Sequence, residues 1–505
     1  MNVKDKTPLK LVHCAMSTGI GGGIERMDAL YNRYIDRSIV DPVFVAVRKN
    51  DPGVKLYDPS ILFRYTGDES RFEKLLPLLA GADIVQFSGG FDPLVCEAAR
   101  SSGAPVLIEL MHLTEPGQIY PNIDVSVCVS ETVRKAQPFR EKTTVIHNGI
   151  DIENFPFNDD PDTGENIVML ESTRREKKMY FHLDEIADDI ARIDPGAKLW
   201  LAGRGQTGES TDRVKFLGLR SDMAKLYRQA DFLVMLSIKE PFGLIVLEAM
   251  ASGCLPIVAD DGGMAEMVTH GVDGWLVDAG DRRAVEEVIK EAISVHGSLK
   301  WLEMRRSARE KVEKEFSGRA CLLKYEKLYR DMIELKGRRK ERGSINVEAP
   351  PEADIADALH NFNGQLWGGV ENSVRRMGAR SAPIKIKQVA DVARLLAKQS
   401  IAHGRVELAD IIYQKLYESG FTDIEMMKEW VNVRAGSDSP IDFILRELML
   451  AEPDNHEWVL LSAEQSLNSG DPAMALEILE KGVEAIPESD ELASTASLLR
   501  RQLGK

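Results

Sequence analysis

The stretch EPFGLIVLEAMASGCLPIVADDGG, residues 240–263, decides the fold of this chain. The apolar run before it, at 232–236, predicts a buried strand. The Pro-Phe-Gly break then predicts the start of a helix over 244–251, which Gly253 ends before the next apolar strand, LPIVA. Gly243 is therefore expected at a helix N-terminus beyond the carboxyl end of a strand. Open parallel sheets bind ligands at such places, and the unpaired N–H groups favour phosphate.

Two carboxylates flank this break. Glu240 leaves the end of the strand, where it can accept hydrogen bonds from sugar hydroxyls. Glu248 lies just over one turn inside the helix, within reach of a second diol such as a ribose. Two sets of hydroxyls joined by a diphosphate fit a nucleotide sugar. The alternative is a pair of solvated charges, the ordinary interpretation of two glutamates at this spacing. The flanking PFGL and GCLPIVADDGG make the whole pattern more specific than the pair.

On both sides of this stretch the chain shows a regular pattern. Strand-like and helix-like segments alternate over 9–150, and the same pattern restarts at ENIVMLES. Such alternation is typical of βαβ units and a parallel sheet. The predicted fold class is α/β, with two Rossmann-like domains facing a cleft, followed by an all-α helical repeat domain. The expected boundaries are 1–155 for the first domain (acceptor side), 156–336 for the second (nucleotide-sugar donor side), 337–384 for a linker or docking segment, and 385–505 for the repeats.

The helical region repeats with a period near 34 residues. Turn glycines at Gly404, Gly436 and Gly470 align three segments of similar pattern. This resembles degenerate tetratricopeptide repeats, in which helix pairs stack to bury their apolar faces. A generic bundle of helical hairpins is the alternative, and either form predicts a binding surface without catalysis. In the preceding segment, Phe362 and Trp367 are expected to pack onto a neighbouring domain, with a partner contact as the alternative.

Composition limits the class of protein. The formal net charge is −16, with 64 basic and 80 acidic residues, which argues against nucleic-acid binding. Five cysteines without C-x-x-C spacing indicate reduced thiols and neither a disulfide framework nor a metal site. No signal peptide is evident and no run approaches about 18 apolar residues, so a cytoplasmic protein is expected. The basic run at 336–342 predicts at most a peripheral membrane contact.

The E-P-F-G-x-x-x-x-E pattern over 240–248 resembles the signature of the retaining glycosyltransferases of family 4, which have the GT-B fold. The resemblance covers about 9–336. It implies transfer of a hexose-type sugar, with retention at the anomeric carbon, from a UDP- or GDP-linked donor to a hydroxyl acceptor. It also implies a metal-independent reaction without a further cofactor. The base is not readable from the sequence.

The resemblance also assigns roles to residues. Glu240 would orient the donor sugar, and His112, which follows the strand PVLIEL, would contact that sugar near the reacting carbon. A lone histidine would otherwise be interpreted as structural. Glu248 would bind the ribose. Gln86 is a further possible contact to the acceptor. The catalytic residues are thus predicted as Glu240 and His112, with no metal ligands.

The same resemblance predicts how the donor phosphates are held. A glycine-rich loop, STGIGGGIER at 17–26, follows the first predicted strand. Such a loop alone often marks only a tight turn, but Gly22 and Gly23 here match a G-G-x-E loop of the family. The family clamps the diphosphate with an arginine and a lysine five residues later; this chain departs from that pattern, because Ser172 stands five before Lys177. Arg174 or Arg175 with Lys177 or Lys178 would supply the charge in a shortened loop, with Arg174 and Lys178 favoured; the alternative is that RREKK is an ordinary exposed charge run. The predicted phosphate and backbone contacts are Gly22, Gly23, Arg174, Lys177, Lys178, Gly243, Leu244 and Ile245.

Two other classes of function are compatible with the sequence besides a glycosyltransferase. One is a GT-B protein of another activity, such as a phosphorylase or an epimerase. The other is a catalytically silent scaffold acting through its helical repeats. For an active transferase, the acceptor is a glycan or lipid-linked glycan, as in polysaccharide biosynthesis, or a protein. The repeats would bind the acceptor, a partner protein or a second copy of the chain.

Overall fold

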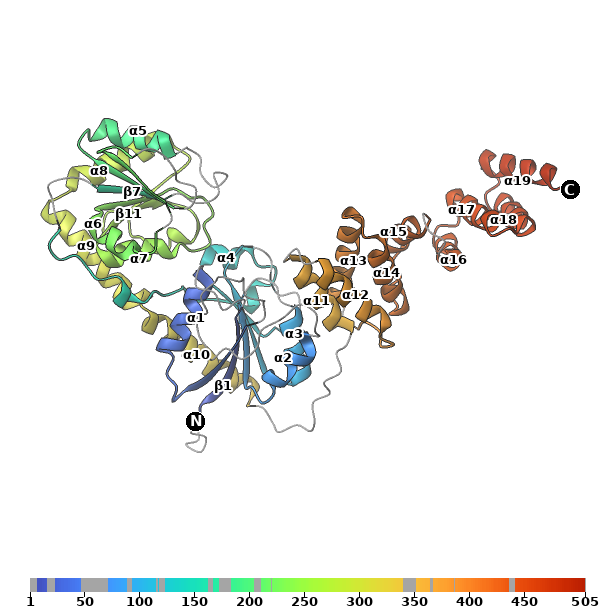
Figure 1. Ribbon diagram of the computed structural model, residues 1–505, viewed down its shortest axis with the longest axis horizontal. Coiled ribbons are helices and arrows are strands. Elements are labelled where there is room, and N and C mark those ends of the chain that lie inside the picture. The colour runs from blue at the N-terminus through green and yellow to red at the C-terminus, as the bar shows by residue number, and fades with distance from the viewer. Residues whose placement is uncertain are drawn as a thin grey trace. The chain divides into compact units, whose positions relative to one another are not determined.

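The structure is a computed structural model of the 505-residue chain, divided into two compact units at residues 347 and 348 (Figure 1). Each unit is described by itself. The first holds two α/β lobes and the second is all helical. The residues described are 7–15, 23–46, 71–88, 93–114, 117, 123–161, 167–171, 183–203, 210–218, 220–338, 351–363, 367–385, 387–435 and 441–504.

The first lobe contains a parallel sheet of six strands in the order β2-β1-β3-β4-β5-β6. β4 is buried along its whole length, as expected for a strand covered by helices on both faces. The strands are β1 Leu9–Ala15, β2 Val40–Ala46, β3 Ile84–Ser88, β4 Val106–Met111, β5 Val125–Cys128 and β6 Thr143–Val145; the helices are α1 Gly23–Tyr34, α2 Arg71–Leu79, α3 Pro93–Ser102 and α4 Glu131–Ala136.

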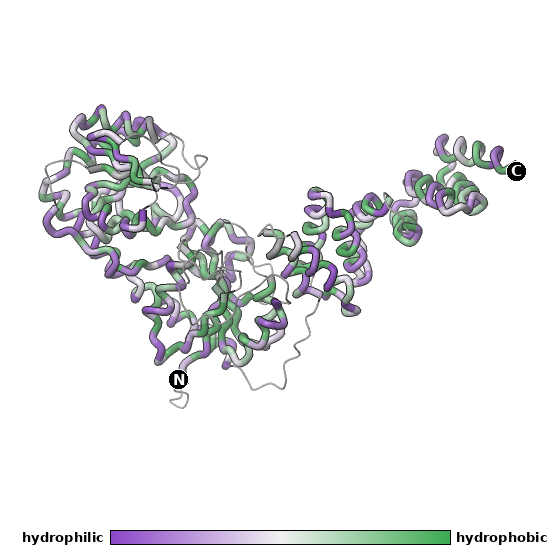
Figure 2. The backbone as a smooth tube through the Cα atoms, viewed as in Figure 1, coloured by the Kyte–Doolittle hydropathy of each residue, from purple (hydrophilic) through white to green (hydrophobic). Residues whose placement is uncertain are grey.

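The second lobe repeats this architecture with strands in the order β12-β11-β10-β7-β8-β9. Its central strands β10 and β11 are fully buried, and apolar residues gather along both sheets (Figure 2). The strands are β7 Ile167–Glu171, β8 Lys198–Ala202, β9 Val214–Gly218, β10 Phe232–Met235, β11 Leu255–Ala259 and β12 Trp275–Val277; the helices are α5 Leu183–Ile193, α6 Met223–Gln229, α7 Leu244–Ser252, α8 Arg282–Val295 and α9 Leu299–Lys311.

The chain crosses between the two lobes twice. At the crossings, Ile150 N donates to Phe316 O at 2.9 Å and Gly318 N donates to Ile150 O at 2.8 Å. The helix that follows, α10 Gly318–Lys336, packs in the core of the first lobe, where Tyr325 and Tyr329 are buried. The sequence pattern grouped this helix with the second domain up to residue 336. The sequence pattern could not show that α10 packs on the first lobe, because an apolar helical face does not reveal which sheet the helix covers.

The second unit confirms the predicted all-α region and extends it toward the N-terminus. Segment 337–384, expected as an irregular linker, contains two helices. Pro351 at the first helical position and acidic Glu352 and Asp354 in the first turn favour a helix start there. The helices are α11 Pro351–Asn363, α12 Trp367–Ala379, α13 Lys387–Ala402, α14 Val406–Glu418, α15 Ile424–Arg434, α16 Asp442–Ala451, α17 His456–Asn468, α18 Pro472–Ala485 and α19 Asp490–Gln502.

The turn glycines of the proposed repeat lie between paired helices. Gly404, with φ 72°, joins α13 to α14, and Gly470, with φ 82°, joins α17 to α18; Gly436 lies outside the described residues. Trp367 contacts the ring of His403 beside the first of these turns, and Phe362 packs against both rings, so these aromatics pack within the helical unit. Helical hairpins are therefore present, while their tetratricopeptide type stays a prediction.

Across the described ranges, no helix combines the length and the apolar character that crossing a bilayer requires.

Candidate active site

The turn after β10 has the predicted form. Gly243 is the N-cap of α7 in the left-handed region, with φ 93° and ψ 63°, and Gly253 ends the helix with φ 88°. Only glycine adopts such conformations without strain. The N–H groups of Leu244 and Ile245 belong to the first turn of α7, where no intrahelical acceptor exists. The helix therefore presents unpaired donors and the positive end of its dipole at the carboxyl end of β10.

The loop at 259–263, ADDGG, packs against this turn. Gly263 N donates to Glu240 O at 2.8 Å, and a Cβ atom on Gly263 would lie only 2.3 Å from Pro241 O. The loop ADDGG is therefore held against EPFG by backbone contact, which explains the glycine pair. Lys239, the one non-glycine residue with positive φ among the described residues, donates its N–H to the Asp261 carboxylate at 2.9 Å. Half-buried Glu240 is thus placed by two fixed loops.

Glu248 lies on the same helix and is only 2 % exposed. Burial raises the pKa of this carboxyl to about 7, while the positive charge of Arg26 opposes the shift. Arg26 comes from α1 of the other lobe and forms an ion pair with Glu248. Arg26 therefore favours the charged form of Glu248 against the effect of burial, from a position 222 residues away in the sequence. This contact has no local sequence signal.

Two of the predicted donor-binding residues, Gly23 of the first lobe and Leu244 of the second, lie next to each other. A Cβ atom on Gly23, the first residue of α1, would lie 3.2 Å from Leu244 Cδ1 at the start of α7. The helix that follows the glycine loop therefore begins beside the helix that follows the EPFG turn. Gly22 itself lies outside the described residues.

His112 follows β4, at the carboxyl end of the first sheet. It is 8 % exposed, and its Nε2 atom is buried without a hydrogen-bond partner among the described residues. Burial lowers the pKa of His112 to about 4, and the negative charge of Asp28 only partly opposes this. At neutral pH the imidazole is uncharged, with one polar atom available to a ligand.

A buried polar network lies beneath α1 and was not predicted. His13 Nε2 lies 2.7 Å from Asp28 Oδ1, and His13 Nδ1 lies 2.9 Å from Gln86 Nε2. Tyr329 on α10 donates to Gln86 Oε1 at 2.7 Å. Gln86 is fully buried here, so the expectation that it contacts an acceptor is wrong. These residues are distant in sequence, and polar side chains that face a sheet interior leave only a break in an apolar pattern.

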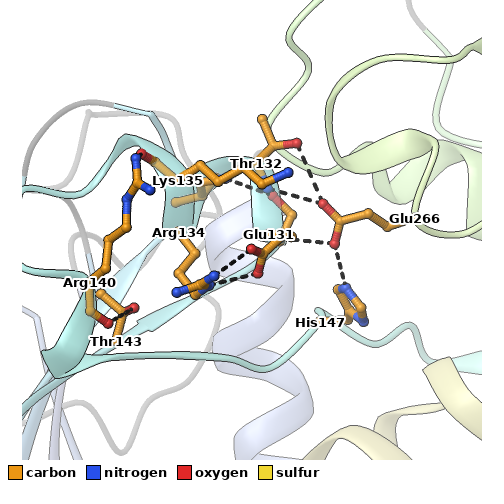
Figure 3. A network of polar contacts seen from close by, with 10 residues as sticks. Glu131, Thr132, Arg134, Lys135, Arg140, Thr143, His147 and Glu266 are labelled. Atoms are coloured by element: carbon orange, nitrogen blue, oxygen red, sulfur yellow. Dashed lines mark hydrogen bonds and ion pairs between the residues drawn. The ribbon is translucent and has the colours of Figure 1, made fainter.

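A third contact between the lobes involves the start of α4 and the residues around Pro241 and Glu266; Figure 3 shows the part of it around Glu266. Ser130 Oγ donates to Pro241 O at 2.6 Å. The Glu266 carboxylate accepts hydrogen bonds from Glu131 N at 2.9 Å and Thr132 N at 3.1 Å, at the start of α4, and lies 2.9 Å from His147 Nε2. Burial alone would raise the pKa of Glu266, but these hydrogen bonds outweigh it and lower the pKa. The carboxylate is charged and holds the first turn of α4.

Some predicted residues cannot be placed. Arg174, Lys177, Lys178 and Ser172 lie outside the described residues, so the predicted basic clamp stays a prediction. Within the described part of the chain, no three potential ligands gather in a way that would hold a metal ion. Metal independence likewise stays a prediction.

Comparison with known proteins agrees with this geometry. Residues 164–294 match the family model "Glycosyl transferases group 1". The N-acetyl-alpha-D-glucosaminyl L-malate synthase of Bacillus anthracis is 32 % identical over 33 % of this chain and 45 % of its own length. The D-inositol 3-phosphate glycosyltransferase of Corynebacterium kroppenstedtii is 25 % identical over 53 % of this chain and 48 % of its own length. The chain thus spans about half the length of the curated relatives it matches.

Solved structures are similar to the two-lobed unit as a whole. The structure of Anabaena HepE in complex with UDP aligns with a TM-score of 0.53 and 19 % identity, over 64 % of this chain and 100 % of that one. Sucrose-phosphate synthase from Thermosynechococcus elongatus aligns with a TM-score of 0.51 and 19 % identity, over 65 % and 100 %. The predicted fold, two Rossmann-like lobes of the GT-B type, is confirmed. The residues that match the glycosyl transferases group 1 model lie in the second lobe.

Proposed function

We propose that this chain transfers a hexose-type sugar from a nucleotide-sugar donor to a hydroxyl acceptor. The observation that carries the proposal is Glu248, a buried carboxylate one turn inside α7, a helix whose N-terminus opens at the carboxyl end of β10. A ribose diol at the carboxylate would place the donor diphosphate at the N–H groups of Leu244 and Ile245. The domain match and the names of the relatives support this assignment.

The remaining roles follow from position. Glu240, held by the backbone of Gly263, would accept hydrogen bonds from the hydroxyls of the transferred sugar. Uncharged His112 would use its unpartnered Nε2 on the same sugar. The N-terminus of α7, aided by basic residues 174–178, would stabilise the departing diphosphate without a metal ion. Positioning then contributes most of the catalysis, with departure and attack on one face and retention at the anomeric carbon.

The donor base and the acceptor are narrower proposals. A UDP- or GDP-linked sugar is proposed, and a uridine donor agrees with one structural relative, Anabaena HepE, whose structure is known in complex with UDP-glucose. The acceptor would be a glycan, a lipid-linked glycan or a protein, met in the cytoplasm. The helical hairpins of the second unit would bind that acceptor, a partner or a second copy.

The test is a titration of the full chain with UDP, GDP and ADP by calorimetry, followed by donor hydrolysis and transfer assays. Glu240→Ala should lower turnover about a hundredfold, because one hydrogen-bonding group at a reacting centre has this effect. Nucleoside diphosphate affinity should change only a few-fold. Glu303→Ala, at an exposed glutamate on α9 of the same lobe, is the matched control and should match wild type.

The proposal fails if no nucleoside diphosphate binds, or if Glu240→Ala turns over like wild type. Turnover that depends on inorganic phosphate would instead indicate a phosphorylase. Binding without any turnover of a range of donors would favour a scaffold.

A further inference from the structure

Two helices from different lobes begin side by side in the first unit. Gly23 at the start of α1 lies against Leu244 at the start of α7, and Arg26, one turn into α1, pairs with Glu248, one turn into α7. The first residues of the two helices contact each other, and so do residues one turn further along each helix. The two helices therefore run in parallel, and their N-termini lie next to each other. The positive ends of two helix dipoles therefore meet in one place, which favours a bound anion.

Arg26 is an unusual residue for this position. A cation in the first turn of a helix faces the positive end of the dipole, which is unfavourable. Its partner Glu248 is nearly inaccessible, whereas half of the Arg26 side chain, 50 %, remains exposed. A guanidinium has five N–H donors, and the Glu248 carboxylate accepts from one of its nitrogens. The exposed part of the group can therefore bind a second acceptor.

We propose that Arg26 binds the diphosphate of a nucleoside diphosphate donor, and that ribose hydroxyls replace it at Glu248 when the donor enters. This inference rests on the proposed function, since it concerns the same site. Both groups keep hydrogen-bond partners in this exchange. Glu248 accepts from ribose hydroxyls in place of the guanidinium, and Arg26 donates to phosphate oxygens in place of the carboxylate. Neither group is left without a hydrogen-bond partner, which would otherwise be costly.

The distances permit the exchange. Glu248 lies four residues beyond Leu244, about 6 Å along α7, and Arg26 lies three residues beyond Gly23, about 4.5 Å along α1. A long arginine side chain spans either length. Turning toward the helix N-termini would bring the guanidinium to the start of α7, where phosphate oxygens can accept hydrogen bonds from it and from the N–H groups of Leu244 and Ile245. Arginine suits this role because its planar fork binds phosphate with two hydrogen bonds.

The competing explanation is that the ion pair only holds the two lobes together. The two explanations differ in what happens to ligands that lack phosphate. If Arg26 contacts the diphosphate, its removal weakens a nucleoside diphosphate but not the matching nucleoside, whose ribose no longer has to displace it. If Arg26 only ties the lobes together, both ligands change by the same factor.

The experiment measures the dissociation constants of UDP, GDP and ADP and of uridine, guanosine and adenosine by calorimetry, with weak nucleosides measured by displacement. Arg26→Ala in the full chain should weaken the bound diphosphate about ten- to a hundredfold, the range for hydrogen bonds to charged groups. The nucleoside should bind as well as before or more tightly. Arg33→Ala is the matched control, because Arg33 is a half-exposed arginine of the same helix paired with Asp151 and Glu153.

Equal changes for nucleoside and nucleoside diphosphate, or no change for either, overturn the inference while leaving the proposed function intact. A wild type that binds none of the diphosphates overturns the proposed function and the inference with it. A loss in Arg33→Ala as large as that in Arg26→Ala would also overturn the inference, since it would reflect disturbance of α1. Far-ultraviolet circular dichroism of each variant checks that the chain is folded.

Discussion

The loop beside Glu240 in the first unit and the hairpin turns of the second unit use glycine for different reasons. In the first unit, Gly262 and Gly263 are pressed against the backbone of residues 240–242, with no room for a Cβ atom. In the second unit, Gly404 and Gly470 have the same positive φ as Gly262, but a Cβ atom on either would meet nothing within 4 Å. Contact fixes the first pair, whereas backbone conformation alone fixes the second.

This difference shows how closely each turn is fixed by its surroundings. The loops around Glu240 must keep one geometry to within the width of an atom, as expected where a ligand is to be positioned. The helical hairpins need only reverse direction, so their surfaces can vary while their packing is kept. Substitutions in the two regions should therefore differ in size, and three of them test the contrast.

The largest effect is expected for Gly263→Ala. Its Cβ atom would lie 2.3 Å from Pro241 O and 2.8 Å from Phe242 Cα, and backbone atoms cannot step aside as a flexible side chain can. A loss of about 3 kcal/mol in the stability of the second lobe is expected. Hydrogen–deuterium exchange of the full chain measures it, with peptides over 232–264 exchanging faster. Peptides from the second unit are the internal control, and unchanged exchange over 232–264 would show that contact does not fix this turn.

An intermediate effect is expected for Glu266→Gln, which removes the charge that holds α4 to the second lobe. About 1 kcal/mol should be lost at neutral pH. The folded-state pKa of Glu266 lies below its ordinary value of 4.5, so this stabilisation is fully present above pH 4.5 and lost as the pH falls through the folded value. Thermal unfolding from pH 7 to pH 3 should therefore bring variant and wild type together in acid. A constant difference across this range would contradict the assignment.

The smallest effect is expected for Gly404→Ala. The cost of the left-handed conformation is about 1 kcal/mol, and the reduced freedom of the unfolded chain offsets part of it. Gly404→Asn should cost less still, because asparagine tolerates this conformation. Exchange of peptides from α13 and α14 measures both variants. A loss as large as that of Gly263→Ala would mean that the turn makes contacts of its own and would remove the contrast between the two units.

Local patterns predicted much of the fold. The strand and helix around Gly243 could be read because an apolar run, a glycine N-cap and a glycine C-cap each act over a few residues. The parallel sheets followed from alternating segments. The positions of His112 after a strand and of Glu248 inside a helix followed from the same local patterns, while their roles stay predictions. The start of α11 at Pro351 carried a signal of the same local kind, proline followed by acidic residues, that the segment's low apolar content obscured.

Long-range contacts could not be predicted. The pairing of Arg26 with Glu248, the return of α10 and the network that buries Gln86 each join residues more than 70 positions apart. Such contacts depend on how the elements are arranged in three dimensions, which one sequence does not specify. The pKa of Glu248 belongs to the same class, because burial by other elements sets it.

The double crossing between the lobes has a mechanical consequence. A single connecting segment would let one lobe swivel about any axis, whereas the two segments here are hydrogen-bonded to each other through Ile150, Phe316 and Gly318. Two bonded segments leave the lobes fewer ways to move relative to each other than one segment would. They thereby help to keep the start of α1 in register with the start of α7, where Gly23 lies against Leu244.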